Sequence, residues 1–163
     1  MSFLLWITGL AGSGKTTIGK KVYESLSDQR VALIDGDDIR KIIQCFDYDL
    51  ESRKSVSWQI HRFCKLLLDQ KISVICCTMS LFDEIHAANA QLNSHIKYVF
   101  LTAETKTRQL RKPDVYSQAN LVGVDIPFSI PANCLVLSNE IEEDINKNSQ
   151  TILNGIKCYF PTI

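Results

Sequence analysis

The sequence predicts an α/β fold in which a five-stranded parallel sheet is covered by helices on both faces. Short apolar runs of strand length alternate with segments of helical apolar spacing, and this alternation is typical of parallel sheets. The first apolar run, FLLWIT, leads into GLAGSGKT and then into a helical segment. The chain has 163 residues, of which 45% are hydrophobic and 22% charged. We therefore expect a single domain over residues 1–163 with a buried core.

The glycine-rich turn after the first strand predicts a phosphate-binding loop, or P-loop. Its glycines allow a tight turn whose N–H groups point at an anion, and the following helix adds its positive N-terminal end. We expect Lys15 to reach the β and γ phosphates as a catalytic residue, and the Thr16 hydroxyl to ligand Mg²⁺. The expected nucleotide-binding residues are Gly9, Ala11, Gly12, Ser13, Gly14, Lys15, Thr16 and Thr17. The alternative is a glycine-rich turn with an incidental lysine.

The first half of the chain gives helix, strand, helix, strand. Residues 16–26 have helical apolar spacing, and residues 31–34 form a short strand that ends at the acidic sequence DGDD. Residues 51–71 read as a long helix, and residues 72–77 as a continuous apolar strand of the doubly buried kind. The apolar contacts expected for the long helix are Trp58, Phe63, Leu66 and Leu67.

The second half repeats the alternation around one irregular segment. Helices are expected over 81–92 and 104–111, with a strand over 96–101 between them. A strand over 134–137 and a helix over 140–159 complete the fold. The closing helix carries its apolar period on Ile141, Ile145, Ile152 and Ile156. The segment at about 111–131 contains Pro113, Gly123, Pro127 and Pro131, and we interpret it as a mobile lid.

Composition excludes several classes of protein. The formal net charge is zero, which argues against a strongly basic nucleic-acid surface. No apolar run is long enough to cross a bilayer, and the N-terminus lacks a secretory signal. The six cysteines show no metal-binding spacing, so buried reduced thiols are the preferred interpretation. We expect a cytoplasmic protein that binds neither nucleic acid nor membrane.

The chain resembles the adenylylsulfate (APS) kinases of the P-loop nucleotide-kinase fold. The resemblance runs nearly end to end and rests on WITGLAGSGKTT, DGDDIR, FDYDLESR, TMSLF and VGVDIPFSIP. It implies an ATP-dependent phosphotransferase that phosphorylates the ribose 3′-hydroxyl of a modified nucleotide. ATP and Mg²⁺ are the implied cofactors, and the partner is a small nucleotide acceptor. A homodimer is a further expectation.

The acidic segment and the acceptor residues are interpreted with this resemblance. An acceptor hydroxyl needs an anionic group to take its proton, and Asp35 at the strand end is the candidate base that matches the family. Asp37 is expected near the substrate or in the water shell of Mg²⁺, although any of these aspartates could instead cap the following helix. The other acceptor residues that the resemblance implies are Arg40, Tyr48, Arg53, Ser80, Phe82 and Leu121. Surface, capping or packing roles are the alternatives for them.

The chain departs from the family pattern on the acceptor side. Val56 stands where an asparagine is usual, and Trp58 and Gln59 replace a basic pair. In the lid, KPDVY replaces a K-G-L-Y sequence, while Ala119 and Leu121 replace a lysine and a clamping phenylalanine. The pattern also looks like the kinases of this family that act on cytidine diphosphoramidate in bacterial surface-polysaccharide pathways. A non-catalytic nucleotide switch and a different small-metabolite kinase remain as alternatives.

Overall fold

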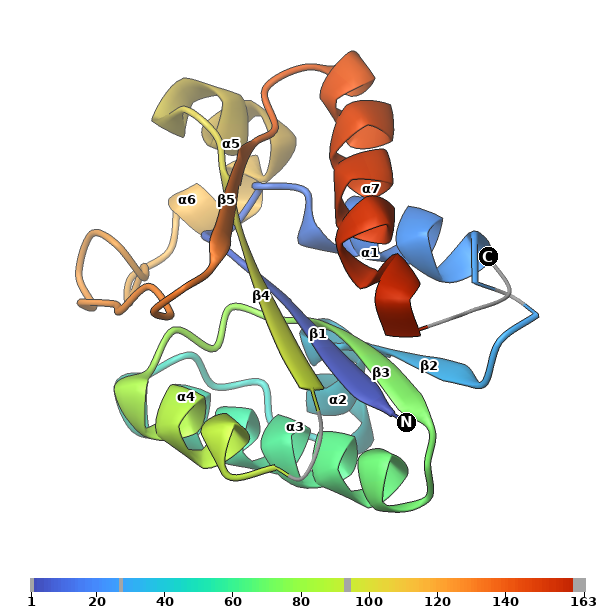
Figure 1. Ribbon diagram of the computed structural model, residues 1–163. Helices are drawn as coiled ribbons and strands as arrows, with labels where there is room; N and C mark the ends of the chain where they lie inside the picture. Colours follow the sequence, from blue (N-terminus) through green and yellow to red (C-terminus); the bar gives the residue numbers. More distant parts are fainter. Residues whose placement is uncertain (1, 27, 93–94, 160–163) are drawn as a thin grey trace.

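A five-stranded parallel sheet runs through the molecule (Figure 1). The computed structural model describes residues 2–26, 28–92 and 95–159. The strands are β1 (Phe3–Thr8), β2 (Val31–Asp35), β3 (Ser73–Cys77), β4 (His95–Thr102) and β5 (Leu135–Ser138). Their order across the sheet is β2-β3-β1-β4-β5, and every neighbouring pair is parallel. The predicted fold class is confirmed. Because β1 is the central strand, the P-loop that follows it lies in the middle of the row of strand C-termini.

Helices cover both faces of this sheet. Their bounds are α1 (Lys15–Glu24), α2 (Gly36–Ile42), α3 (Leu50–Asp69), α4 (Asp83–Ala90), α5 (Thr105–Arg111), α6 (Pro113–Tyr116) and α7 (Glu142–Ile156), followed by a 3₁₀ turn at Lys157–Tyr159. Helices α1 and α7 lie on one face, while α2, α3 and α4 lie on the other (Figure 1).

The fully buried strand β1 joins the two layers of the core. Leu5 and Ile7 pack in the cluster that includes Ile18 of α1. Leu4 and Trp6 point to the opposite face and pack in the cluster that includes residues of α3. Alternate side chains therefore enter different layers, as the two-residue period of a strand requires.

Two short helices, α2 and α6, were not among the helices given ranges from the sequence, although a helix capped by the acidic run was the alternative left open there. Helix α2 begins directly after Asp35, whose carboxylate accepts the Asp37 N–H at 2.9 Å and caps the helix. The acidic run that we read as a strand-end turn therefore also occupies a first helical turn, where negative charge is favourable. Helix α6 begins at Pro113, a residue suited to the first helical position.

Two expected apolar contacts are wrong, and the cysteine prediction holds in part. Leu66 is 56% exposed, because the buried face of α3 follows Val56, Ile60, Cys64 and Leu68 instead. Ile141 is 58% exposed and precedes α7. All six cysteines lie in the described ranges and are free. Cys64, Cys76 and Cys77 are buried, whereas Cys45 and Cys134 are half-buried and Cys158 is exposed.

The segment between α5 and β5 is anchored at its C-terminal half. The Leu121 carbonyl accepts the N–H groups of three following residues. Val122 and Ile126 pack in a small cluster with Leu81 and Phe100. The mobility that we expect of this segment stays a prediction. Within the described ranges, no helix combines the length and the apolar character needed to span a bilayer.

Candidate active site

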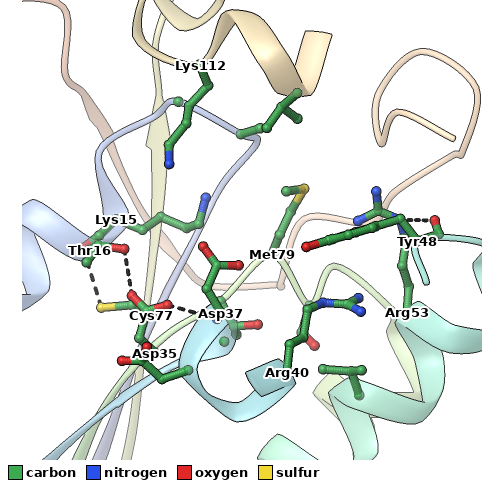
Figure 2. A pocket seen from close by; sticks show the side chains of 18 of the residues that line it. Lys15, Thr16, Asp35, Asp37, Arg40, Tyr48, Arg53, Cys77, Met79 and Lys112 are labelled. Carbon is green, nitrogen blue, oxygen red and sulfur yellow. Dashed lines mark hydrogen bonds between the residues drawn. The ribbon is translucent and has the colours of Figure 1, made fainter. Parts of the chain in front are cut away.

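The predicted site residues gather around one cavity of about 990 Å³ (Figure 2). Its lining comes from the P-loop, the ends of β2 and β3, helices α2 and α3, and the segment that follows α5. In a parallel sheet these strand ends meet at one edge, which is where ligands bind. The cavity holds a donor side next to the P-loop and an acceptor side next to α3.

The P-loop is held from behind by side chains distant in sequence. The buried Asn139 donates its side-chain N–H to the Ser13 carbonyl at 2.8 Å. The Tyr116 hydroxyl donates to the Ala11 carbonyl at 3.0 Å, and Arg111 donates to the Gly12 carbonyl at 3.2 Å. These contacts engage the carbonyls of three consecutive loop residues. The Ser13 N–H donates to the Leu10 carbonyl, so the other N–H groups of the loop are those that an anion could bind.

Gly14 shows why this loop requires glycine. Its φ is 93°, and a Cβ at this position would lie 2.2 Å from the side-chain nitrogen of Asn139. Any side chain would therefore meet both backbone strain and a buried neighbour. Gly14 also precedes α1 directly, so the tight turn and the helix N-terminus meet at one point, an arrangement suited to phosphate.

Lys15 lies within the loop that precedes it. Its ammonium group donates to the carbonyls of Gly9 and Leu10 at 2.9 and 3.0 Å. Burial lowers the pKa of Lys15 from 10.5 to about 8, even though the nearby Asp37 and Asp35 carboxylates raise it. The cation is poorly compensated, because carbonyl dipoles replace full negative charges. A bound phosphate would supply that charge.

Thr16 and Asp35 form the oxygen-rich corner of the donor side. The Thr16 hydroxyl donates to Asp35 at 2.6 Å, while the second Asp35 oxygen caps α2. A hydroxyl and a carboxylate together are ligands that Mg²⁺ prefers. Thr17 also lines the cavity, whereas Gly9 and Ser13 do not. The Gly9 carbonyl binds Lys15 instead, and the Ser13 side chain is buried.

Asp37 lies between the donor and acceptor sides. Figure 2 shows its carboxylate pointing into the cavity, with Lys15 on one side and Arg40 on the other. Asp37 comes from the first turn of α2, directly after the capped strand end. Asp35 and Asp37 therefore have different surroundings, although the sequence shows them only as two members of one acidic run.

Tyr48 contacts two guanidinium groups on the acceptor side. The central carbon of the Arg40 guanidinium lies 4.4 Å from the centre of the Tyr48 ring, and that of Arg53 lies 5.3 Å from it. Arg40 is buried and donates to the Asp47 carbonyl at 2.8 Å. Arg53 donates to the carbonyls of Tyr48 and Asn120 at 2.7 and 2.9 Å. Arg53 thus joins the start of α3 to the segment after α6.

The two arginines make this part of the cavity suited to an anion. Burial and the neighbouring Arg40 lower the pKa of Arg53. Because arginine keeps its charge in proteins, burying this guanidinium beside Arg40 costs free energy. An anionic ligand between the two cations would offset that energy. The remaining predicted acceptor residues, Ser80, Phe82 and Leu121, also line the cavity.

Several lining residues escaped the sequence analysis. They are Lys20, Lys41, Phe46, Ser57, Ile60, Cys77, Thr78, Met79, Arg111, Lys112, Val115 and Gln118. Two of them, Arg111 and Lys112, stand in the basic run at the start of the irregular segment, which was a usable signal. Burial raises the pKa of the Cys77 thiol to about 12, so this cysteine remains protonated at neutral pH.

Comparison with known proteins gives the family. A family model described as Adenylylsulphate kinase matches residues 1–138. The chain belongs to the adenylylsulphate kinase family. It is 34% identical to the cytidine diphosphoramidate kinase of Campylobacter jejuni, over 94% of this chain and 96% of that protein. It is 29% identical to the adenylyl-sulfate kinase of Pseudomonas aeruginosa, over 97% and 87% of the two chains.

Solved structures agree on the fold. The Mycobacterium tuberculosis APS kinase in complex with AMPPNP and APS has a TM-score of 0.81 and 21% identity, with 96% of this chain and 98% of that chain covered. As a member of the adenylylsulphate kinase family, the chain is an ATP-dependent phosphotransferase. Of the two classes that the sequence left open, enzyme and regulatory switch, the family supports the enzyme.

Proposed function

We propose that this kinase transfers the γ-phosphoryl group of ATP to the ribose 3′-hydroxyl of cytidine diphosphoramidate, rather than to that of adenylylsulfate. The observation that carries the proposal is the acceptor side of the cavity. Tyr48 contacts two arginines, and Leu121, at the position where the APS kinase pattern that the chain resembles has a clamping phenylalanine, supplies no ring to the cavity. A pyrimidine offers less surface for stacking than a purine and needs less of a clamp.

Similarity to a named relative supports the same acceptor. The Campylobacter jejuni kinase named for cytidine diphosphoramidate is 34% identical over almost the full length of both chains. Seven adenylyl-sulfate kinases that match this chain by sequence, among them that of Pseudomonas aeruginosa, are 26% to 30% identical to it. The acceptor pattern and this difference in identity point the same way. A role in a bacterial surface-polysaccharide pathway and a cytoplasmic location belong to this proposal.

The residues of the donor side have different roles in phosphoryl transfer. Lys15 would neutralise charge on the transferring phosphoryl group. Mg²⁺ fits the oxygen pair of Thr16 and Asp35 and, when bound, supplies charge neutralisation at the β and γ phosphates. Asp37 points into the cavity between Lys15 and Arg40 (Figure 2), and we assign it the role of base in place of Asp35. Asp35 is already engaged by Thr16 and by the α2 cap.

The side chains of this protein account for the proton transfer and for the alignment of the acceptor in the proposed reaction. The 3′-hydroxyl gives its proton to the Asp37 carboxylate, and its oxygen forms the new bond to phosphorus. The bond from that phosphorus to the bridging oxygen of ATP breaks, and the departing charge remains on ADP. Arg40 and Arg53 hold the anionic end of the acceptor, which aligns the hydroxyl for attack.

Turnover with a panel of acceptors tests this function. ADP release and formation of the phosphorylated acceptor would be followed with cytidine diphosphoramidate, adenylylsulfate, simple nucleotides and sugars. We expect the highest kcat/KM with cytidine diphosphoramidate. Preference for adenylylsulfate would return the chain to the sulfate-activating members of the family, and preference for a sugar would contradict both assignments.

A substitution at position 121 sharpens the test. Leu121→Phe should raise kcat/KM for adenylylsulfate relative to the cytidine compound, because the larger ring overlaps both rings of adenine and crowds a pocket fitted to cytosine. Leu121→Met is the matched control, since it conserves volume without adding a ring. An unchanged ratio in Leu121→Phe would show that residue 121 does not face the base. Sedimentation of the same preparations would decide the predicted homodimer.

A further inference from the structure

One end of the acceptor side is an uncharged recess against α3. We define the recess by the lining residues Val56, Ser57, Ile60, Ser80 and Phe82, all of them buried. Val56, Ile60 and Phe82 pack in one apolar cluster, so the polar atoms of the recess side chains are two hydroxyls. An apolar recess with a few polar atoms suits a nucleobase better than a phosphate, which would need the arginines outside it.

Two positively charged side chains of α3, those of Arg53 and Lys54, interact with groups other than the recess serines. The Arg53 guanidinium binds backbone carbonyls and contacts Tyr48. Lys54 lies 6.0 Å from the centre of the Phe82 ring and pairs with Glu84 at 3.1 Å. The two serines therefore supply the hydrogen-bonding chemistry of the recess. Whether each serine hydroxyl can donate a hydrogen bond to a ligand, or can only accept one, depends on where its proton lies.

The two hydroxyl protons are both committed within the protein. Ser57 donates to the Arg53 carbonyl at 2.8 Å, one helical turn earlier. A hydroxyl has a single proton, so Ser57 can only accept in its contact with Ser80, and Ser80 is the donor of that bond. The order is Ser80 to Ser57 to the Arg53 carbonyl. The Ser80 oxygen keeps its two lone pairs, so toward a ligand it can only accept.

The backbone holds this arrangement in place. The His86 ring nitrogen Nε2 lies 3.3 Å from the Ser80 carbonyl oxygen. Burial lowers the pKa of His86, which favours a neutral ring whose single N–H can donate to that carbonyl. Ser80 is thus fixed through its main chain by α4 and through its side chain by α3.

We propose that Ser80 selects the acceptor base by accepting a hydrogen bond from its exocyclic amino group, with Ser57 as the positioning residue that commits the Ser80 proton. Cytosine presents an amino group at the position where uracil presents a carbonyl oxygen. That oxygen would face a second lone pair and leave two buried acceptors without a donor. The inference rests on the proposed function and adds to it the residues that distinguish cytidine from uridine.

The test compares cytidine diphosphoramidate with uridine diphosphoramidate as acceptors. For the wild type we expect kcat/KM to favour the cytidine compound by about 10- to 100-fold, the usual effect of a buried unpaired polar group. Ser57→Ala should reduce this ratio to within a few-fold, mainly by improving the uridine compound, because the Ser80 proton is then free to donate to the uracil oxygen. Ser80→Ala should also reduce the ratio, but by weakening the cytidine compound.

Two further variants separate positioning from packing. Ser57→Thr keeps the hydroxyl and should keep the preference. Ser55→Ala removes an exposed serine from the same helix and should leave both the ratio and the ATP KM unchanged. Thermal melting of each variant would show that the fold is intact.

The outcomes distinguish this inference from the proposed function. Equal kcat/KM values for both compounds in the wild type would overturn the base-reading role while the kinase assignment stands. A Ser57→Ala enzyme that keeps the wild-type ratio would overturn the role of Ser57. If neither compound is phosphorylated while adenylylsulfate is, the proposed function fails and this inference fails with it.

Discussion

Nucleotide affinity should weaken as the pH rises through 8, because Lys15 loses its proton there. The free protein holds this ammonium group among backbone carbonyls, and burial lowers its pKa to about 8. Bound phosphates stabilise the charged form and raise the pKa again. The nucleotide complex therefore carries a proton that the free protein has lost above pH 8. By linkage, the dissociation constant for ATP should increase about tenfold for each pH unit above 8.

Calorimetric titration with ATP from pH 7 to 10, at constant ionic strength, would measure this dependence. Lys15→Arg should bind with little change over the same range, because a guanidinium does not lose its proton. Lys15→Met should bind weakly at pH 7 and show no decline centred on pH 8. An affinity that stays constant to pH 9.5 in the wild type, or the same decline in Lys15→Met, would refute the reasoning.

Lys15 should also make the stability of the nucleotide-free protein depend on pH, but here stability increases with pH whereas ATP affinity decreases. Its pKa is about 8 in the folded protein against an ordinary value of 10.5, so the unfolded chain binds more protons between these two pH values. The free energy of unfolding of the nucleotide-free protein should therefore rise across this window relative to that of Lys15→Met. The upper limit is about 3 kcal/mol, and partial exposure of Lys15 makes a smaller value the expectation. Denaturant unfolding at several pH values would measure it.

Five other substitutions test the base, the stacking residue and the P-loop. Asp37→Asn should reduce kcat by about 10²-fold or more with little change in Mg²⁺ requirement, whereas Asp35→Asn should raise the Mg²⁺ concentration needed for half-maximal activity; the reverse pattern in a metal titration would restore Asp35 as the base. Tyr48→Ala should remove about 1–3 kcal/mol of stacking energy and raise the acceptor KM by the corresponding factor, while the ATP KM stays unchanged. Equal changes in both KM values would exclude a base-stacking role. Gly14→Ala should destabilise the fold by about 1–3 kcal/mol, as measured by denaturant unfolding, and Asn139→Ala in the same chain should recover part of the loss because its side chain lies where the new Cβ would be.

The donor side was predictable because its residues lie close together in sequence. The P-loop, its lysine and its threonine occupy consecutive positions, and backbone geometry fixes their relation to one another. What the sequence did not show is how the loop is supported. Asn139 and Tyr116 reach it from segments more than 100 residues away. Their contacts arise from the order of strands in the sheet, which local periodicity does not specify.

Short elements and exposed apolar residues were the weakest part of the prediction. Helix α2 spans seven residues directly after a strand, a length at which apolar spacing carries little information. Leu66 fits the helical period as well as its neighbours do, but the contact of α3 with the sheet runs through Ile60 and Cys64 instead. In both cases tertiary packing decided the outcome.

The residues of the acceptor side could be predicted from the sequence, but the contacts between them could not. All seven predicted acceptor residues line the cavity. The direction of the hydrogen bonds from Ser80 through Ser57 to Arg53, and the contact of Tyr48 with two arginines, depend on segments that meet only in the fold. The donor side combines P-loop main-chain groups with the side chains of Lys15, Thr16 and Asp35, which would bind the part of ATP that does not depend on the acceptor. The acceptor side consists of side chains from α3, the loop after β3 and the segment after α6, each of which can change without disturbing the P-loop. Substitutions that redirect the enzyme to another acceptor should therefore fall on these three segments and leave ATP affinity unaltered.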